Sequence, residues 1–225
     1  MKMDVVILAA GKGNRLKPLT NKTPKALIKL GDTAIIEMIL DSLPENKIKN
    51  VFIITKHLED RINKYLKGKK TKYKFNIETI TQGEEKGTYG ALLSSKKYIG
   101  DWFVVLNGDD IHSKKYISRF FNNQIIIGVS KKISNYFEVI FDKEKNFEKF
   151  ERISKKKNRY IATGCYTLNK KFFKLTPEKT SEGEFGIPQT IEANLDKLKP
   201  KVLIEKEWHQ LNTLEDLKYL NKIFK

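Results

Sequence analysis

Cysteine, proline and long apolar runs are scarce in this sequence. Its 225 residues contain one cysteine, Cys165, which excludes an internal disulfide framework and indicates a reducing compartment. No apolar run is long enough to cross a bilayer, and the apolar stretch after Met1 is too short for a secretory signal. Internal repeats, low-complexity tracts and proline-rich linkers are also missing. We therefore expect one cytoplasmic folding unit without a membrane partner; the sequence leaves its oligomeric state open.

Acidic residues are in the minority. Lys and Arg number 44 against 27 Asp and Glu, which gives a formal net charge of +17 and a pI of about 9.7. Such a charge raises the possibility of nucleic-acid binding. The lysines are spread along the whole chain, however, and no interleaved aromatic residues suggest a base-stacking platform. Because a lysine-rich surface also attracts polyphosphate substrates, we expect no nucleic-acid partner.

The first half of the chain alternates between two kinds of segment. Short, continuous apolar runs are typical of strands buried on both faces, and stretches with apolar residues three or four apart are typical of helices. The strands are expected at residues 4–10, 51–55 and 102–106, and the helices at about 34–43, 58–67 and 88–98. This alternation predicts an α/β fold with a mainly parallel sheet, whose ligands bind outside the carboxyl ends of the strands.

The pattern changes after about residue 124. Closely spaced strand-like segments suggest antiparallel pairs laid on the first sheet, and helices return near the end of the chain. The strands are expected at residues 124–130, 136–141, 146–153 and 159–168, and the helices near 183–195 and 213–224. We interpret residues 1–225 as one domain with a first part, 1–124, and a second part, 125–225.

A glycine-rich loop follows the first predicted strand. Gly11 and Gly13 allow backbone N–H groups to approach an anion, and Arg15 and Lys25 follow closely. The dinucleotide fingerprint requires a third glycine where Leu16 stands, and the P-loop pattern of Gly-Lys followed by Ser or Thr is absent. A different kind of phosphate loop remains.

Residues 8–27, LAAGKGNRLKPLTNKTPKAL, resemble the N-terminal signature of the sugar-1-phosphate nucleotidyltransferases. That signature reads Leu-Ala-Ala-Gly-x-Gly-Ser/Thr-Arg, then Pro-Leu-Thr and Pro-Lys-x-Leu, and Asn14 is the one departure. The resemblance implies a Rossmann-like sheet flanked by helices, the nucleotide-diphospho-sugar transferase fold, with a small antiparallel sugar-binding part. It also implies a magnesium-dependent reaction of a nucleoside triphosphate with a sugar-1-phosphate, as in the short uridylyltransferases and heptose-phosphate guanylyltransferases.

The resemblance implies catalytic roles for Arg15 and Lys25 and a nucleotide-binding role for the loop residues Leu8, Ala10, Gly11 and Gly13. The chemistry agrees, because nucleotidyl transfer must bring two polyanions together and depends on positioning and charge neutralisation. Arg15 offers a planar fork for phosphate oxygens, and Lys25 offers a point charge.

The metal ligands implied by the resemblance lie in two segments. Asp109, in VVLNGDDI, matches the family's Gly-Asp and is expected to be catalytic as a Mg²⁺ ligand, whereas Asp110 is expected to face the sugar or solvent. In WHQLNTLEDL, Gln210 aligns with an aspartate that binds the metal in many relatives. Asn212 aligns with the ligand of other branches, and we favour it. His209 is expected to pack rather than bind a metal.

The base and the sugar have candidate contacts as well. The resemblance assigns base recognition to Gln82 and Gly87, and Thr88 is expected to line the nucleotide site and to cap the helix that follows. It assigns sugar contacts to Gly164 and Glu184. The family's Thr-Asp after the latter is replaced by Pro188-Gln189, which leaves the identity of the sugar open.

Two other functions are compatible with the sequence. A cytidylyltransferase that acts on a non-sugar phosphate such as phosphocholine would carry the same loop. A regulatory protein that binds nucleotide without turnover would explain the change from Asp to Gln at position 210. Neither the base nor the sugar can be named from the sequence, because specificity depends on a few hydrogen bonds in pocket loops.

Overall fold

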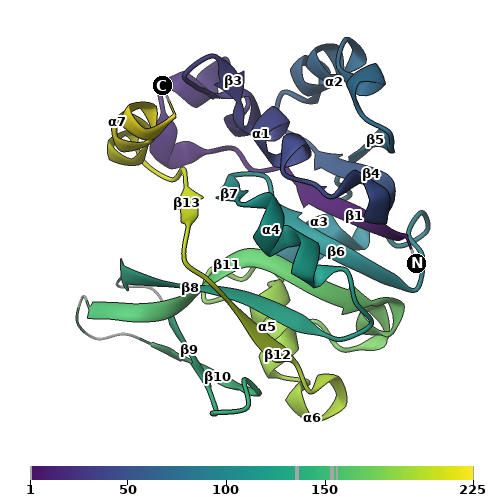
Figure 1. The fold of residues 1–225 in the computed structure, drawn as a ribbon, viewed down its shortest axis with the longest axis vertical. Coiled ribbons are helices and arrows are strands. Elements are labelled where there is room, and N and C mark those ends of the chain that lie inside the picture. Colours follow the sequence, from purple (N-terminus) through teal and green to yellow (C-terminus); the bar gives the residue numbers. More distant parts are fainter. Residues whose placement is uncertain (1, 135–136, 153–154, 156, 225) are drawn as a thin grey trace.

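The computed structural model describes residues 2–134, 137–152, 155 and 157–224. Within these residues, seven strands form the main sheet in the order β12-β8-β11-β6-β1-β4-β5 (Figure 1). The strand bounds are β1 Met3–Leu8, β4 Ile48–Thr55, β5 Asn76–Thr81, β6 Trp102–Asn107, β8 Ile126–Ser134, β11 Lys157–Asn169 and β12 Lys201–Glu205. β11 runs antiparallel to both of its neighbours, and the other pairings are parallel. The predicted α/β fold with a mixed, mainly parallel sheet is therefore confirmed.

Smaller elements complete the chain. Three two-stranded sheets pair β2 with β3, β7 with β13 and β9 with β10 among the described residues. Their bounds are β2 Lys29–Leu30, β3 Thr33–Ala34, β7 Asp110–His112, β9 Phe137–Phe141, β10 Phe147–Arg152 and β13 Trp208–Gln210. The helices are α1 Ile35–Asp41, α2 Glu59–Lys67, α3 Gly87–Leu93, α4 Lys114–Ile117, α5 Ile187–Glu192, α6 Leu195–Leu198 and α7 Leu214–Ile223.

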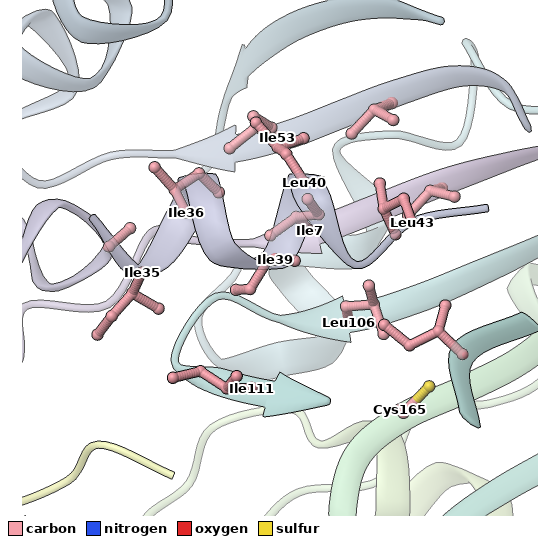
Figure 2. Packing of buried hydrophobic residues seen from close by; sticks show 14 of the residues in the cluster. Ile7, Ile35, Ile36, Ile39, Leu40, Leu43, Ile53, Leu106, Ile111 and Cys165 are labelled. Carbon is pink, nitrogen blue, oxygen red and sulfur yellow. The ribbon is translucent and has the colours of Figure 1, made fainter. Parts of the chain in front are cut away.

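The central strands alternate between two hydrophobic cores, as expected for strands buried on both faces. In β1, Val5 and Ile7 face one core and Val6 faces the other. The first core is covered by α1, whose isoleucines and leucines pack over β1, β4 and β6 (Figure 2). The second core is covered by α3 and α5. Burial on both faces explains why these strands are continuous apolar runs in the sequence.

Several predicted elements differ from the observed ones. The predicted helix 183–195 is interrupted, because α5 begins at Ile187 and a separate helix, α6, follows it. The strands β5 and β12 were not predicted, since each is short and carries polar residues at the sheet edge. The second part of the chain adds β8, β11 and β12 to the main sheet instead of laying them on it, whereas β9 and β10 form a separate pair. Residues 136 and 153 of the predicted strands lie outside the described residues.

The C-terminal helix α7 returns to the N-terminal part of the chain. Figure 1 shows it next to β3, and the backbone N–H of Gly31, in the turn between β2 and β3, donates to Asn221 at 3.0 Å. This return brings the segment before α7 to the carboxyl ends of β1 and β6. No helix among the described residues has the length and apolarity that a membrane span requires.

Candidate active site

A cavity of about 710 Å³ lies at the carboxyl ends of the central parallel strands. Most of the site residues predicted from the sequence line it. These are Leu8, Ala10, Gly11, Gly13, Arg15, Lys25, Gln82, Gly87, Thr88, Asp109, Glu184 and Asn212. Gly164 and Gln210 do not line it. Sequence reasoning missed Lys12, Lys56, Lys86 and Asn107 on the wall, because isolated lysines are common in this chain and Asn107 looks like the end of a strand.

The glycine loop leaves β1 and forms the floor of the cavity. Gly13 has φ +63°, and a Cβ at this position would lie 2.8 Å from Cγ2 of Thr20. Thr20 donates its hydroxyl to the Gly13 carbonyl at 2.9 Å, which holds the loop against the next turn. Leu16 is fully buried beneath the loop. The positive φ and the close contact explain why glycine is required here.

Four side chains meet at the mouth of this loop. The ammonium group of Lys25 contacts Oδ2 of Asp109 and lies 3.1 Å from Oδ1 of Asn212. The same Oδ1 accepts a hydrogen bond of 3.1 Å from Nη2 of Arg15. The side chains of Lys25 and Asp109 are only 15% and 19% exposed. Two positively charged side chains and two side chains that present oxygen atoms thus come together from distant parts of the chain.

The position of Asn212 depends on the pairing of β13 with β7. Gln210 pairs with Asp110, and the N–H of Leu211 donates to the carbonyl of Asp109 at 3.1 Å. The helix α7 then starts with a capping box in which Oδ2 of Asp216 accepts hydrogen bonds of 2.8 Å from the N–H groups of Asn212 and Thr213. Asn212 is therefore held on both sides, while Gln210 remains in the strand pair away from the cavity wall.

The structure contradicts the expectation that Asp110 faces the sugar or solvent. Asp110 is fully buried, and its two oxygens accept hydrogen bonds from Nε1 of Trp208 at 2.9 Å and from Nδ2 of Asn107 at 3.0 Å. Burial raises the pKa of Asp110 well above its usual range, and the nearby charge of Asp109 adds to the rise. Asp109 lies in the turn between β6 and β7, whereas Asp110 is the first residue of β7, and only Asp109 lines the cavity.

The opposite end of the cavity is formed by the segment between β5 and α3. Nε2 of Gln82 donates to the carbonyl of Glu85 at 2.7 Å, which fixes its side-chain amide. Gly87 has φ +84°, and a Cβ there would lie 2.2 Å from the carbonyl oxygen of Phe185. Only glycine allows this close approach between α3 and the segment before α5.

Thr88 does not cap the helix that contains it, which corrects the sequence-based expectation. The helix α3 already begins at Gly87, and the N-cap position is Lys86. The Thr88 hydroxyl instead accepts a hydrogen bond of 3.0 Å from the N–H of Ile187, the first residue of α5. Thr88 therefore ties the two helices together beside the cavity.

The two predicted sugar contacts differ in position. Glu184 lies on the cavity wall, in the extended segment before α5 and not in a first helical turn. Gly164 lies in β11 behind the wall with φ +68°, and a Cβ there would lie 2.0 Å from Nδ2 of Asn107. The space next to the Cα of Gly164 is thus filled by side-chain atoms of Asn107 and Asp110. His209, as expected, packs; its ring lies edge-on to Phe224 with centroids 5.4 Å apart.

Comparisons with known proteins agree with this geometry. Over 187 residues the chain is 35% identical to the bifunctional protein GlmU of Methanocaldococcus jannaschii, covering 82% of this chain and 44% of that protein. The chain thus spans less than half the length of this relative. It is 28% identical over 208 residues to the D-glycero-alpha-D-manno-heptose 1-phosphate guanylyltransferase of Campylobacter jejuni, and this match covers 90% of each chain.

Solved structures share the fold. A UDP-glucose pyrophosphorylase complexed with UDP-glucose superposes with a TM-score of 0.83 at 17% identity, covering 100% of this chain and 98% of that one. A putative glucose-1-phosphate thymidylyltransferase of Bacillus anthracis gives 0.81 at 24% identity and covers 98% and 94%. These likenesses confirm the nucleotide-diphospho-sugar transferase fold. Because the family model described as "Nucleotidyl transferase" matches residues 4–223, nearly the whole chain, the chain belongs to the nucleotidyl transferase family.

Proposed function

We propose that this chain joins a sugar-1-phosphate to a nucleoside triphosphate and releases pyrophosphate. The observation that carries the proposal is the meeting of Arg15, Lys25, Asp109 and Asn212 at the mouth of the glycine loop. This arrangement suits a reaction between two polyanions, which needs fixed positive charge and an ordered approach. The name of the Campylobacter jejuni relative, a heptose 1-phosphate guanylyltransferase, agrees with such an activity.

In this proposal a phosphate oxygen of the sugar-1-phosphate forms a bond to the α-phosphorus of the triphosphate. The bond between the α-phosphorus and the bridging oxygen breaks, and pyrophosphate leaves with the electron pair. The attacking oxygen is already an anion, so the reaction requires no general base. Arg15 and Lys25 neutralise the charge that builds on the phosphates, with Arg15 as a planar donor and Lys25 as a point charge.

Asp109 and Asn212 fit a magnesium site. Both of their oxygens contact the same Lys25 nitrogen, so one cation can reach both. Carboxylate and amide oxygens are suitable ligands, and Mg²⁺ takes its remaining ligands from substrate phosphates and water. The described residues contain no cluster of three or more His, Cys, Asp or Glu side chains that could hold a metal, which fits a site completed by substrate. When bound, the ion would stabilise negative charge on the phosphate oxygens.

The remaining roles follow the cavity. The glycine loop would hold the phosphates, Gln82 and Gly87 the base, and Glu184 the sugar. The lone buried cysteine supports a cytoplasmic location for the reaction. Asn212 lies on the cavity wall and Gln210 does not. The Gln at position 210 is therefore no argument for a regulatory protein that binds nucleotide without turnover.

The proposal is tested with four nucleoside triphosphates, each combined with several sugar-1-phosphates and with phosphocholine. Pyrophosphate release is measured at saturating Mg²⁺. We expect release with at least one sugar-1-phosphate and its loss in Asp109→Asn, which keeps the size of the side chain but removes its charge. Release with phosphocholine alone would favour the cytidylyltransferase alternative. Nucleotide binding without release from any pair would contradict an enzymatic role.

A further inference from the structure

A hydrogen-bonded chain of three side chains, two of them buried, leads inward from the cavity wall beside the proposed magnesium site. It consists of Trp208 in β13, Asp110 in β7 and Asn107 at the end of β6. Trp208 and Asp110 are 7% and 0% exposed, and neither lines the cavity. None of the steps proposed above uses Asp110 or Trp208. A buried carboxylate is costly unless it is well bonded, so its presence here needs a reason.

The location of Asp110 gives that reason. Its carboxylate reaches the two segments that carry the proposed metal ligands. Through Trp208 it holds β13, which leads into Asn212, and through Asn107 it holds the residue two before Asp109. Both of its oxygens are occupied, one by each partner.

The strand β7 is itself well anchored. The side chain of Ile111 is buried in the core beside Leu106 and below α1 (Figure 2). Nδ1 of His112 lies 2.6 Å from Oε2 of Glu205, and both side chains are almost fully buried. Asp110 therefore lies on a fixed support from which it can hold the neighbouring strand β13.

The neighbour β13 is a short strand. It pairs with β7 at only three positions among the described residues, Trp208 with His112 through Gln210 with Asp110. Such a short two-stranded pair is marginal without side-chain contacts. Because Trp208 lies two positions from the partner of Asp110, the two side chains share one face and bridge the strands diagonally.

Gly164 completes the arrangement. A Cβ at this position would lie 2.0 Å from Nδ2 of Asn107 and 2.4 Å from Oδ2 of Asp110, the two atoms of their hydrogen bond. Glycine at position 164 thus leaves space for the Asn107–Asp110 bond. This explains the residue without a direct contact to substrate.

We propose that Asp110 is a positioning residue that, through Trp208 and Asn107, holds Asn212 beside Asp109 in the geometry that the cation requires. The proposal rests on the proposed function, because the cation site belongs to it. Asp110 touches no substrate in this scheme. Loss of the hydrogen bonds of Asp110 should loosen the segment that carries Asn212 and thereby weaken cation binding.

The chain offers a matched control, because Trp102 and Trp208 are its only tryptophans. Trp208→Phe removes the N–H donor and keeps an aromatic ring, and Trp102→Phe makes the same change at the far end of β6. Hydrogen exchange of the Leu211 amide, which donates to Asp109, is measured by NMR in both variants. We expect about tenfold faster exchange in Trp208→Phe and no change in Trp102→Phe, as the loss of one buried hydrogen bond predicts.

The magnesium dependence of pyrophosphate release provides the functional measurement. We expect Trp208→Phe to require roughly tenfold more Mg²⁺ for half-maximal rate, with a near-normal rate at saturation and an unchanged KM for triphosphate. Asp110→Asn leaves one acceptor oxygen for two donors and should also raise the Mg²⁺ requirement. The effects of the two substitutions should add less than fully in the double variant, because both act on the same chain of hydrogen bonds. If Asp110→Asn does not fold, the two tryptophan variants still decide the question.

The possible results are distinct. Equal exchange of Leu211 in the two tryptophan variants would overturn the proposal. Faster exchange in Trp208→Phe with an unchanged magnesium requirement would also overturn it, because the bond would then be merely structural. If the wild-type chain releases no pyrophosphate, the proposed function fails. Binding of Mn²⁺ with triphosphate, measured by electron paramagnetic resonance, then replaces the rate, and an equal Mn²⁺ affinity in both variants would overturn the positioning role.

Discussion

The ammonium group of Lys25 contacts the carboxylate of Asp109, a residue 84 positions further along the chain. The same nitrogen lies 3.1 Å from the side-chain oxygen of Asn212, 187 positions away. A single lysine thus joins the glycine loop, the end of β6 and the segment before α7. In the proposed reaction, this lysine and the metal would both approach the same two oxygens.

Replacement of Lys25 should therefore separate metal binding from turnover. In Lys25→Ala, Asp109 loses its neighbouring positive charge, so we expect Mn²⁺ to bind more tightly in the absence of nucleotide. Turnover should nevertheless fall about a hundredfold, because the charge that neutralises the phosphates is gone. Electron paramagnetic resonance of Mn²⁺ and pyrophosphate release provide the two measurements. Lys149→Ala, on the exposed strand β10, is the control, and weaker Mn²⁺ binding in Lys25→Ala would contradict the prediction.

Arg15 is expected to act mainly on the rate. Its guanidinium group donates to Asn212 at the mouth of the loop, where charge builds in the transition state. Arg15→Ala should lower kcat about a hundredfold or more and change triphosphate affinity much less. Steady-state kinetics and direct binding of the triphosphate distinguish these effects. Normal kcat with poor affinity would show that Arg15 only binds the ground state.

Asn212 and Gln210 should differ in their effect on magnesium. Asn212 lies on the cavity wall against Lys25, whereas Gln210 is paired with Asp110 in the strand. Asn212→Ala should raise the Mg²⁺ requirement sharply, and Gln210→Ala should matter less. Gln210→Asp should give little improvement, because its position is not on the wall. A magnesium titration of pyrophosphate release compares the three variants after each has been checked for native folding. The reverse ranking would identify Gln210 as the ligand.

A fourth prediction concerns stability and pH. The hydroxyl of Tyr65 donates to Glu37 at 2.6 Å, and this bond, reinforced by Lys69 and Lys72, lowers the pKa of Glu37 from 4.5 to about 2. The folded state therefore favours the ionised carboxylate. Its stabilising contribution is fully present above pH 4.5 and is lost as the pH falls toward 2. The shift corresponds to roughly 3 kcal/mol, which screening of the two half-exposed lysines reduces to about 2 kcal/mol.

Glu37→Gln should accordingly destabilise the protein by about 2 kcal/mol at pH 7, and the difference from wild type should shrink as the pH falls from 4.5. Urea unfolding between pH 7 and pH 3 measures this. Glu151→Gln is the control, because its carboxylate pairs with Lys149 on the exposed surface and should contribute little at any pH. A constant difference between Glu37→Gln and wild type across this range would contradict the assignment.

The strands at the centre of the sheet and the glycine loop could be predicted from the sequence because they depend on local features. The continuous apolar run of residues 5–8 is typical of a strand buried on both faces, and β1 is such a strand. The positive φ of residue 13 and its close contact with Thr20 require glycine, so this feature of the loop is visible in the sequence. Edge strands such as β12 escaped prediction because partial exposure removes the regular apolar pattern.

Tertiary structure alone decided the roles of similar residues that lie next to or near each other in the sequence. Asp109 and Asp110 are adjacent carboxylates after β6, yet Asp109, in the turn, reaches the cavity and Asp110, at the start of β7, is buried against Trp208, 98 positions away. Likewise, Gln210 and Asn212 align equally well with ligand positions of relatives. Only the pairing of β13 with β7 turns Asn212 toward Lys25 and keeps Gln210 in the strand. The sequence by itself determined which chemical groups are present and where the central strands and the glycine loop form. Which oxygens meet at one point was decided by long-range strand pairing, because the direction of a side chain depends on register and not on the residue type.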